Sequence, residues 1–153
     1  MSLVLVMVYE AGQREKSTWW PYFNILPEDF DTLMQWSPSE LAELQGSAVA
    51  KKIGKAEADV SFIEKLLPIV KSHHALFGDQ SAVFAGSDAA TQLLQIAHRM
   101  ATVIMAYAFD LEAEQVDEDW HDDTSEIPSL PKAMVPLADL LNADGDMNNV
   151  GST

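Results

Sequence analysis

The chain contains no cysteine among its 153 residues. Disulfide bonds, thiolate metal sites and cysteine nucleophiles are therefore excluded. Long apolar runs are also missing, because the run at residues 3–8 is far shorter than the ~20 residues that a membrane span needs. That run also lacks the basic flank and the cleavage signature of a secretory signal. We therefore expect a soluble intracellular protein that does not contact a membrane.

Positive charge is scarce. Lys and Arg number 9 against 24 Asp and Glu, which gives a net charge of -15 and a pI near 4.3. Nucleic-acid binding requires clustered Lys and Arg, so we expect no nucleic-acid partner, whereas a negative field favours the approach of basic proteins.

The acids are concentrated in one part of the chain. Between Asp110 and Glu126 there are nine of them and no Lys or Arg. A run of like charge is usually a solvated loop. Few apolar residues there can offset the entropy of ordering, so residues 112–125 are predicted to be the most mobile internal segment.

Signatures of hydrolases and metal sites are weak. The serines and histidines form no nucleophile elbow. His73 and His74 are adjacent, so on a helix they point ~100° apart and cannot share a metal. Oxygen ligands alternate after Asn142 as at the start of a calcium loop, but Met147 stands where that loop needs Gly and Thr153 where it needs Glu. We predict no metal site.

Hydrophobic residues make up 48% of the chain, enough for the core of one domain. Apolar side chains at steps of three and four predict a long helix at 47–72, kinked or ended early by Pro68, and a second, central one at 89–109. Ser37, Pro38 and Glu40 have the order of a helix start. The segments expected to be irregular are a turn at 27–31, a short extended piece at 33–36 and a loop at 77–86.

The stretch 134–142, Met-Val-Pro-Leu-Ala-Asp-Leu-Leu-Asn, is apolar apart from one carboxylate and one amide. Alone it predicts a short buried strand, or a first helical turn after Pro136, followed by a turn. Its simplest interpretation is a packing segment, since apolar runs mostly fill cores.

Three upstream stretches change that interpretation. They are Ser-Thr-Trp-Trp-Pro-Tyr-Phe at 17–23, Ile-Leu-Pro at 25–27 and Met-Ala-Tyr-Ala-Phe at 105–109. Followed by 134–142, they resemble the SET-domain protein-lysine methyltransferases, in the branch that contains Rubisco large-subunit methyltransferase and its animal and fungal relatives. The resemblance covers roughly residues 3–149 but only part of the family's domain.

The resemblance implies a mainly α fold with little strand, the helical insertion (i-SET) of a SET domain. Residues 1–134, with the acidic loop 110–126, would form that insertion, and residues 135–153 would be the truncated start of the C-terminal SET segment. The apolar pattern of residues 3–14 suits a strand or a helix, and the resemblance favours a helix that stops at Gly12.

The resemblance also implies site residues. Asn142 and Tyr107 match positions that bind S-adenosyl-L-methionine, although Ala143 replaces the histidine that follows the asparagine in the family. The positions that match substrate-binding residues are Trp19, Ala108 and Asp110. The plain interpretation of Trp20, Tyr22 and Phe23, by contrast, is a core plug, since aromatic residues bury large areas.

The expected function is that of a fragment of an S-adenosyl-L-methionine-dependent protein-lysine N-methyltransferase, inactive alone, whose partner is a basic, lysine-containing protein in the nucleus or the cytoplasm. The family's Gly-x-Gly donor loop and its late catalytic tyrosine have no counterpart here, so no catalytic residue is assigned. Two alternatives remain open: an acidic helical module that binds basic proteins without chemistry, and a fragment without function.

Overall fold

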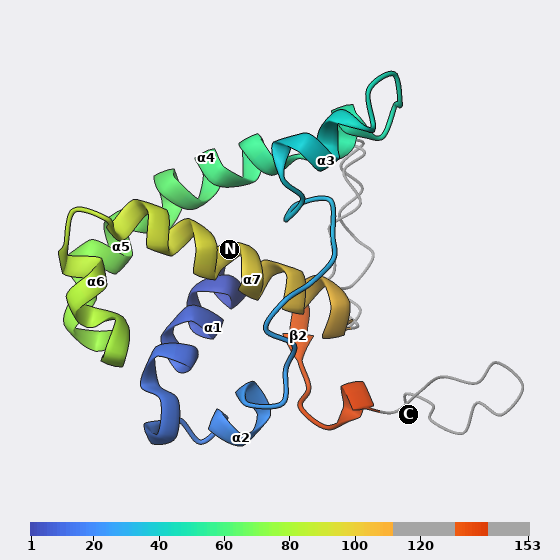
Figure 1. The fold of residues 1–153 in the computed structure, drawn as a ribbon. Coiled ribbons are helices and arrows are strands. Elements are labelled where there is room, and N and C mark those ends of the chain that lie inside the picture. The colour runs from blue at the N-terminus through green and yellow to red at the C-terminus, as the bar shows by residue number, and fades with distance from the viewer. Residues whose placement is uncertain (112–130, 141–153) are drawn as a thin grey trace, which may run out of the picture. The chain divides into compact units, whose positions relative to one another are not determined.

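The computed structural model describes residues 1–111 and 131–140. The chain forms two compact units, Met1–Met105 and Ala106–Thr153. Helices dominate the described part (Figure 1), which also contains two short strands. The predicted mainly α class is confirmed. None of the described helices is long and apolar enough to cross a membrane.

Helix α1 spans Ser2–Gln13 and contributes Val4, Met7 and Val8 to the core. The predicted stop at Gly12 is wrong. The helix ends at Gln13, because the φ of 47° at Arg14 breaks the helical backbone, and Arg14 begins the short 3-10 turn η1, Arg14–Lys16. Gly12 serves a different purpose, because a Cβ atom there would lie 2.5 Å from the carbonyl oxygen of Phe77.

Helix α2, Trp20–Phe23, follows directly. The buried hydroxyl of Ser17 accepts a hydrogen bond from the amide of Trp19, at 3.0 Å, so Ser17 stabilises this turn although Trp19 is the N-cap residue. The extended piece predicted at 33–36 is wrong: residues 33–35 form a turn, closed by the Gln35 amide donating to the Thr32 carbonyl at 2.8 Å. The Thr32 hydroxyl also bonds the Gln35 side chain, which favours the turn.

Helix α3, Pro38–Ala42, starts as predicted. Ser37 and Glu40 form a capping box, in which each side chain bonds the other residue's backbone amide. The hydrogen bonds that the Ser37 side chain and amide donate lower the pKa of the Glu40 carboxyl below its ordinary value.

The helix predicted at 47–72 is shorter and broken. After the 3-10 turn η2, Ala50–Lys52, the chain passes through Gly54 at φ 71° into α4, Lys55–Lys65, and α5, Leu67–Ser72. The left-handed backbone at Gly54 prevents an earlier start. The break near Pro68 is confirmed, since Leu66 separates α4 from α5 and Pro68 lies in the first turn of α5.

The loop predicted at 77–86 is wrong. Two 3-10 turns, η3 at His74–Leu76 and η4 at Gly78–Gln80, lead into helix α6, Ser81–Ala85. Phe84 is completely buried and meets the ring of Phe77 edge-on at 5.4 Å, so tertiary packing stabilises this short helix.

Helix α7 spans Ala89–Tyr107, within two residues of the prediction. It supplies much of the core, as the sequence predicted for a central helix. The largest completely buried side chains are Phe84, Leu93, Met100, Val8, Val70 and Val103.

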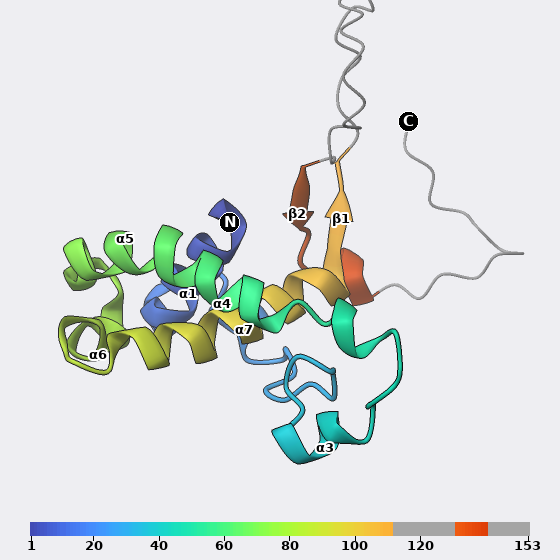
Figure 2. The ribbon, with the colours of Figure 1, turned by 90° about the horizontal axis from the view of Figure 1, so that it is seen from above.

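In the second unit, strand β1, Ala108–Asp110, pairs antiparallel with β2, Lys132–Met134, as Figure 2 shows. The 3-10 turn η5, Ala138–Leu140, follows Pro136. The sequence predicted either a short buried strand or a helical turn after Pro136 for the stretch 134–142. Its described part begins with Met134, the half-buried last residue of β2, and forms a helical turn after Pro136. The turn predicted to follow lies outside the described residues. The predicted mobile segment 112–125 lies outside the described residues.

Candidate functional site

The β1–β2 ladder brings two predicted site residues against the stretch that begins at Met134. Ala108 is paired with Met134 and Asp110 with Lys132. Tyr107, the last residue of α7, directly precedes this ladder. Two of the predicted site positions are thus paired with segment 132–134, which is 22 or more residues later in the chain, and a third directly precedes their strand.

Alternation along the strands sorts the ladder into two faces. Because paired residues share a face, Ala108, Asp110, Lys132 and Met134 lie on one side of the ribbon. Asp110 is not an isolated carboxylate there, since Lys132 Nζ forms an ion pair with its Oδ1. Their side chains are 54% and 51% exposed, so solvent reaches both groups.

The predicted donor residues are only partly described. Tyr107 is half-buried, whereas Asn142 and Ala143 lie outside the described residues. Two cavities of about 590 and 480 Å³ lie in the first unit, and Tyr107 lines neither. Of the two predicted donor residues the structure thus describes Tyr107, and its contact with the donor stays a prediction.

Trp19 lies in the first unit, at the start of α2, with half of its surface exposed. Tyr22 and Phe23, three and four residues later, are each 7% exposed. The structure thus separates a solvent-facing tryptophan from aromatic residues that fill the core. This is compatible with a surface role for Trp19, although its predicted contact with a substrate stays a prediction.

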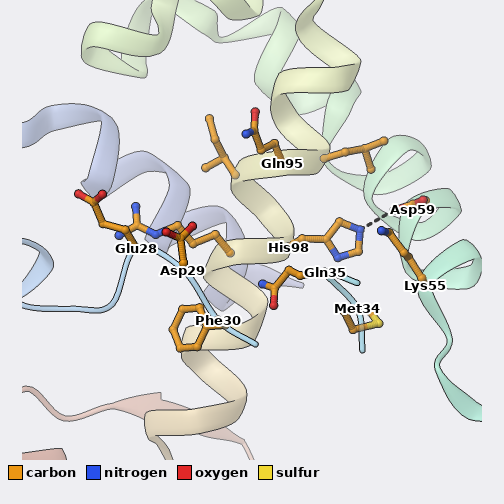
Figure 3. A pocket seen from close by; sticks show the side chains of 12 residues that line it. Glu28, Asp29, Phe30, Met34, Gln35, Lys55, Asp59, Gln95 and His98 are labelled. Carbon is orange, nitrogen blue, oxygen red and sulfur yellow. Dashed lines mark hydrogen bonds and ion pairs between the residues drawn. The ribbon is translucent and has the colours of Figure 1, made fainter. Parts of the chain in front are cut away.

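The larger cavity is a feature that the sequence did not reveal. It lies over one face of α7, and Figure 3 shows Glu28 and Asp29 on one side and Lys55 and Asp59 on the other. His98 lines it and bonds Asp59 Oδ1 through Nε2 at 2.5 Å, with 12% of its side chain exposed.

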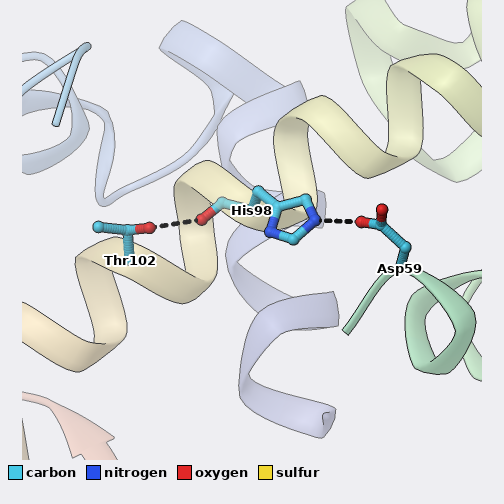
Figure 4. A network of polar contacts seen from close by, with 3 residues as sticks. All are labelled: Asp59, His98 and Thr102. Atoms are coloured by element: carbon cyan, nitrogen blue, oxygen red, sulfur yellow. Dashed lines mark hydrogen bonds and ion pairs between the residues drawn. The ribbon is translucent and has the colours of Figure 1, made fainter. Parts of the chain in front are cut away.

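The contacts of His98 connect two helices. Phe62 of α4 meets the imidazole edge-on at 5.1 Å, and the Asp59 carboxylate of the same helix is hydrogen-bonded to its Nε2. On α7 itself, the Thr102 hydroxyl donates to the His98 carbonyl at 2.9 Å (Figure 4). The hydrogen bond between His98 and Asp59 joins residues 39 positions apart, a separation that local sequence patterns do not detect. Within the described part of the chain, no three His, Asp or Glu side chains are placed to hold a metal ion.

Comparisons with known proteins identify the relatives of this chain. It is 32% identical to ribosomal lysine N-methyltransferase 4 of Saccharomyces cerevisiae over 99% of its own length and 31% of the yeast protein. It is 32% identical to the N-lysine methyltransferase setd6 of Xenopus laevis, over 92% of its own length and 29% of that protein. A shorter stretch of 51 residues is 45% identical to the chloroplastic Rubisco large-subunit N-methyltransferase of Pisum sativum.

No protein-family model matches the chain, and no solved structure matches it. The relatives nevertheless agree in the reaction that their names describe, and the alignments with two of them cover 99% and 92% of the chain at 32% identity. The chain spans about three tenths of the length of those two relatives. The chain therefore belongs to the family of SET-domain protein-lysine methyltransferases, and it aligns with only a part of each relative.

Proposed function

We propose that the chain is the helical part of an S-adenosyl-L-methionine-dependent protein-lysine N-methyltransferase. The observation that carries this proposal is the match of 99% and 92% of the chain to two lysine methyltransferases. In the proposed division, residues 1–134 form the helical insertion of the SET domain and residues 135–153 begin its C-terminal segment. We place the activity inside the cell, in the nucleus or the cytoplasm, as the family resemblance implies.

The proposed reaction transfers a methyl group to a lysine of the substrate protein. The ammonium of a lysine must lose its proton before its nitrogen can attack, and S-adenosyl-L-methionine supplies the methyl group. Most of the catalytic benefit then comes from alignment and exclusion of water. In our proposal Ala108 and Asp110 of the second unit contact the basic substrate protein, and Tyr107 and Asn142 contact the donor. Trp19 of the first unit is proposed separately as a residue that contacts the substrate protein.

We further propose that the chain alone is inactive. One amide contact contributes on the order of 1 kcal/mol, whereas micromolar affinity needs about 8 kcal/mol. Contacts from Tyr107 and Asn142 are too few to supply that energy, and Ala143 removes the imidazole that the family places next to the asparagine. The remaining contacts would have to come from the parts of the family's domain that this chain does not match.

A chimera tests the proposal. The 153-residue chain replaces the matched segment of the yeast relative, and transfer of a labelled methyl group to yeast ribosomes is measured. We expect transfer by the chimera and none by the chain alone. The Trp19→Ala chimera should show a higher KM for the protein substrate with little change in donor affinity. The Asn142→Ala chimera should bind the donor more weakly, with little change in the KM for the protein substrate. A folded chimera that transfers no methyl group would contradict the proposal.

A second candidate function rests on the net charge of -15. An acidic helical module could bind basic proteins by charge alone, with no chemistry. Such binding would weaken steeply with salt and would not depend on Tyr107 or Asn142. The chimera distinguishes the two functions, since only the first produces methylated lysine.

A further inference from the structure

Lys132 is the positively charged residue on the face of the β1–β2 ribbon that carries Asp110. The two residues are direct cross-strand partners, and their side chains form an ion pair although both are about half exposed. The pair therefore stands in solvent, where another cation can approach the same carboxylate.

The rest of that face suits an aliphatic chain. Ala108 and Met134 form the adjoining cross-strand pair, and both are partly buried. The face therefore has an apolar half next to a carboxylate. A lysine side chain needs this combination, because its four methylenes favour an apolar surface and its ammonium favours a negative charge.

We propose that Lys132 is an internal competitor of the substrate: its ammonium occupies the carboxylate of Asp110 that a basic side chain of the substrate protein would otherwise bind. The inference rests on the proposed function, which places Asp110 in the substrate site. Lys132 thereby lowers the affinity for the substrate, because the substrate's cation must displace the Lys132 ammonium from Asp110.

The competing interpretation is that the ion pair only stabilises the ribbon. Opposite charges directly across an antiparallel pair do favour its register. The two interpretations predict different effects on substrate binding. Removal of Lys132 tightens substrate binding if Lys132 competes for Asp110, and leaves it unchanged or weakens it if the pair only holds β1 against β2.

The experiment measures binding of a fluorescein-labelled nonapeptide with one central lysine to the full 153-residue chain, by anisotropy at low salt. Lys132→Gln and Lys132→Met both remove the competing charge, and Met keeps most of the aliphatic stem. We expect each to bind the peptide about two- to fivefold more tightly, the range for an exposed ion pair, and the gain to vanish at high salt. Lys132→Arg should bind like the unaltered chain.

Three controls isolate the effect. Lys71→Gln changes the net charge equally at an exposed position on α5 and should leave binding unchanged. A peptide with norleucine in place of lysine keeps the stem without the ammonium and should not respond to Lys132→Gln. In an Asp110→Asn background the gain from Lys132→Gln should disappear, because the contested carboxylate is gone.

The proposal is overturned if Lys132→Gln and Lys132→Met bind the lysine peptide no more tightly than the unaltered chain, if Lys71→Gln gives the same gain, or if no variant binds the peptide. Circular dichroism of each variant verifies that its helical content is retained. Methyl transfer is not the readout here. A chimera that fails to methylate would therefore contradict the proposed function, while the peptide result decides the role of Lys132 separately.

Discussion

At the residue scale, Gly12 shows how tertiary contact overrides a local rule. A glycine near the end of an apolar helical pattern usually marks the helix stop, which is why the sequence predicted one here. Gly12 instead lies inside α1, buried where the backbone of residues 77 and 78 approaches it. The sequence could not predict this, because the approach joins segments 65 residues apart.

We expect Gly12→Ala to destabilise the chain by about 1–3 kcal/mol, since its Cβ would be forced against the Phe77 carbonyl. In an ordinary helix interior the same change would stabilise by up to about 1 kcal/mol. Urea denaturation decides the sign. Gly86→Ala is the comparison, because its Cβ would lie 3.3 Å from the Val83 carbonyl oxygen, a close contact that needs a much smaller shift than the 2.5 Å approach at Gly12. A stabilised Gly12→Ala chain would show that the close approach is absent.

Leu137 is the second residue whose backbone is informative. It follows Pro136 in a turn closed by the Ala138 amide and the Val135 carbonyl at 3.1 Å, and its φ is 78°. Leucine is disfavoured there by about 1–2 kcal/mol. We expect Leu137→Gly to raise the free energy of unfolding by about 0.5–1 kcal/mol, since glycine adopts this φ without strain but loses more entropy on folding.

Leu137→Ala is the matched variant, because it retains a Cβ and hence the backbone strain while removing most of an exposed side chain. It should therefore not reproduce the gain. Both free energies come from the same urea titrations. Equal stabilisation by Gly and Ala would attribute the effect to the side chain and not to the backbone.

Glu40 gives a pH-dependent prediction at the same scale. Its pKa is lowered in the folded chain by the hydrogen bonds from Ser37. A depressed carboxyl pKa contributes stability above the unfolded pKa, and that stability is lost as the pH falls through the folded pKa. Ser37→Ala keeps the backbone hydrogen bond and removes the hydroxyl, so we expect it to move the Glu40 pKa back toward 4.5. NMR titration of the Glu40 side chain measures this change. An unchanged titration in Ser37→Ala would rule out the hydroxyl as the main cause.

At the scale of elements, local chemistry was predictable and tertiary packing was not. The start of α3 and the break at Pro68 follow from side chains within one turn, so the sequence predicted both. Helix α6 depends on Phe84 packing against Phe77, which no local pattern encodes. The late start of α4 depends on Gly54 adopting φ 71°, whereas the apolar spacing before it is equally compatible with a helix.

The contact between α4 and α7 is the element-scale feature that the sequence missed entirely. Phe62 is the buried residue of α4, and the Asp59–His98 bond is its polar link to α7. We expect Asp59→Asn to destabilise the chain by about 1 kcal/mol, reduced from the value for a buried charged bond because Asp59 is 36% exposed. Amide exchange in α4 should accelerate more than in α7.

Glu64→Gln is the control for that variant, since it removes an exposed acid from the same helix. It should leave both stability and exchange nearly unchanged. If the amides of α4 exchange at the same rate in the Asp59→Asn variant as in the unaltered chain, the contact with His98 does not stabilise this helix.

At the scale of the whole molecule, the fold class and the family were predictable because short motifs along the chain lie in a fixed order. The candidate site was predictable only in part. Ala108 and Asp110 were identified as site positions, yet their partners Met134 and Lys132 became visible only in the ladder register. The neutralisation of Asp110 by Lys132 likewise depends on strand pairing, which a single sequence does not specify.

The most direct test of our central claim, that this chain supplies part of a methyltransferase and not a complete one, is calorimetric titration of S-adenosyl-L-methionine into the 153-residue chain, with the yeast chimera measured in parallel. We expect binding to the chain too weak to measure at micromolar concentrations, and clear binding to the chimera. A low-micromolar dissociation constant for the chain alone would contradict us, because the chain would then hold a donor site of its own.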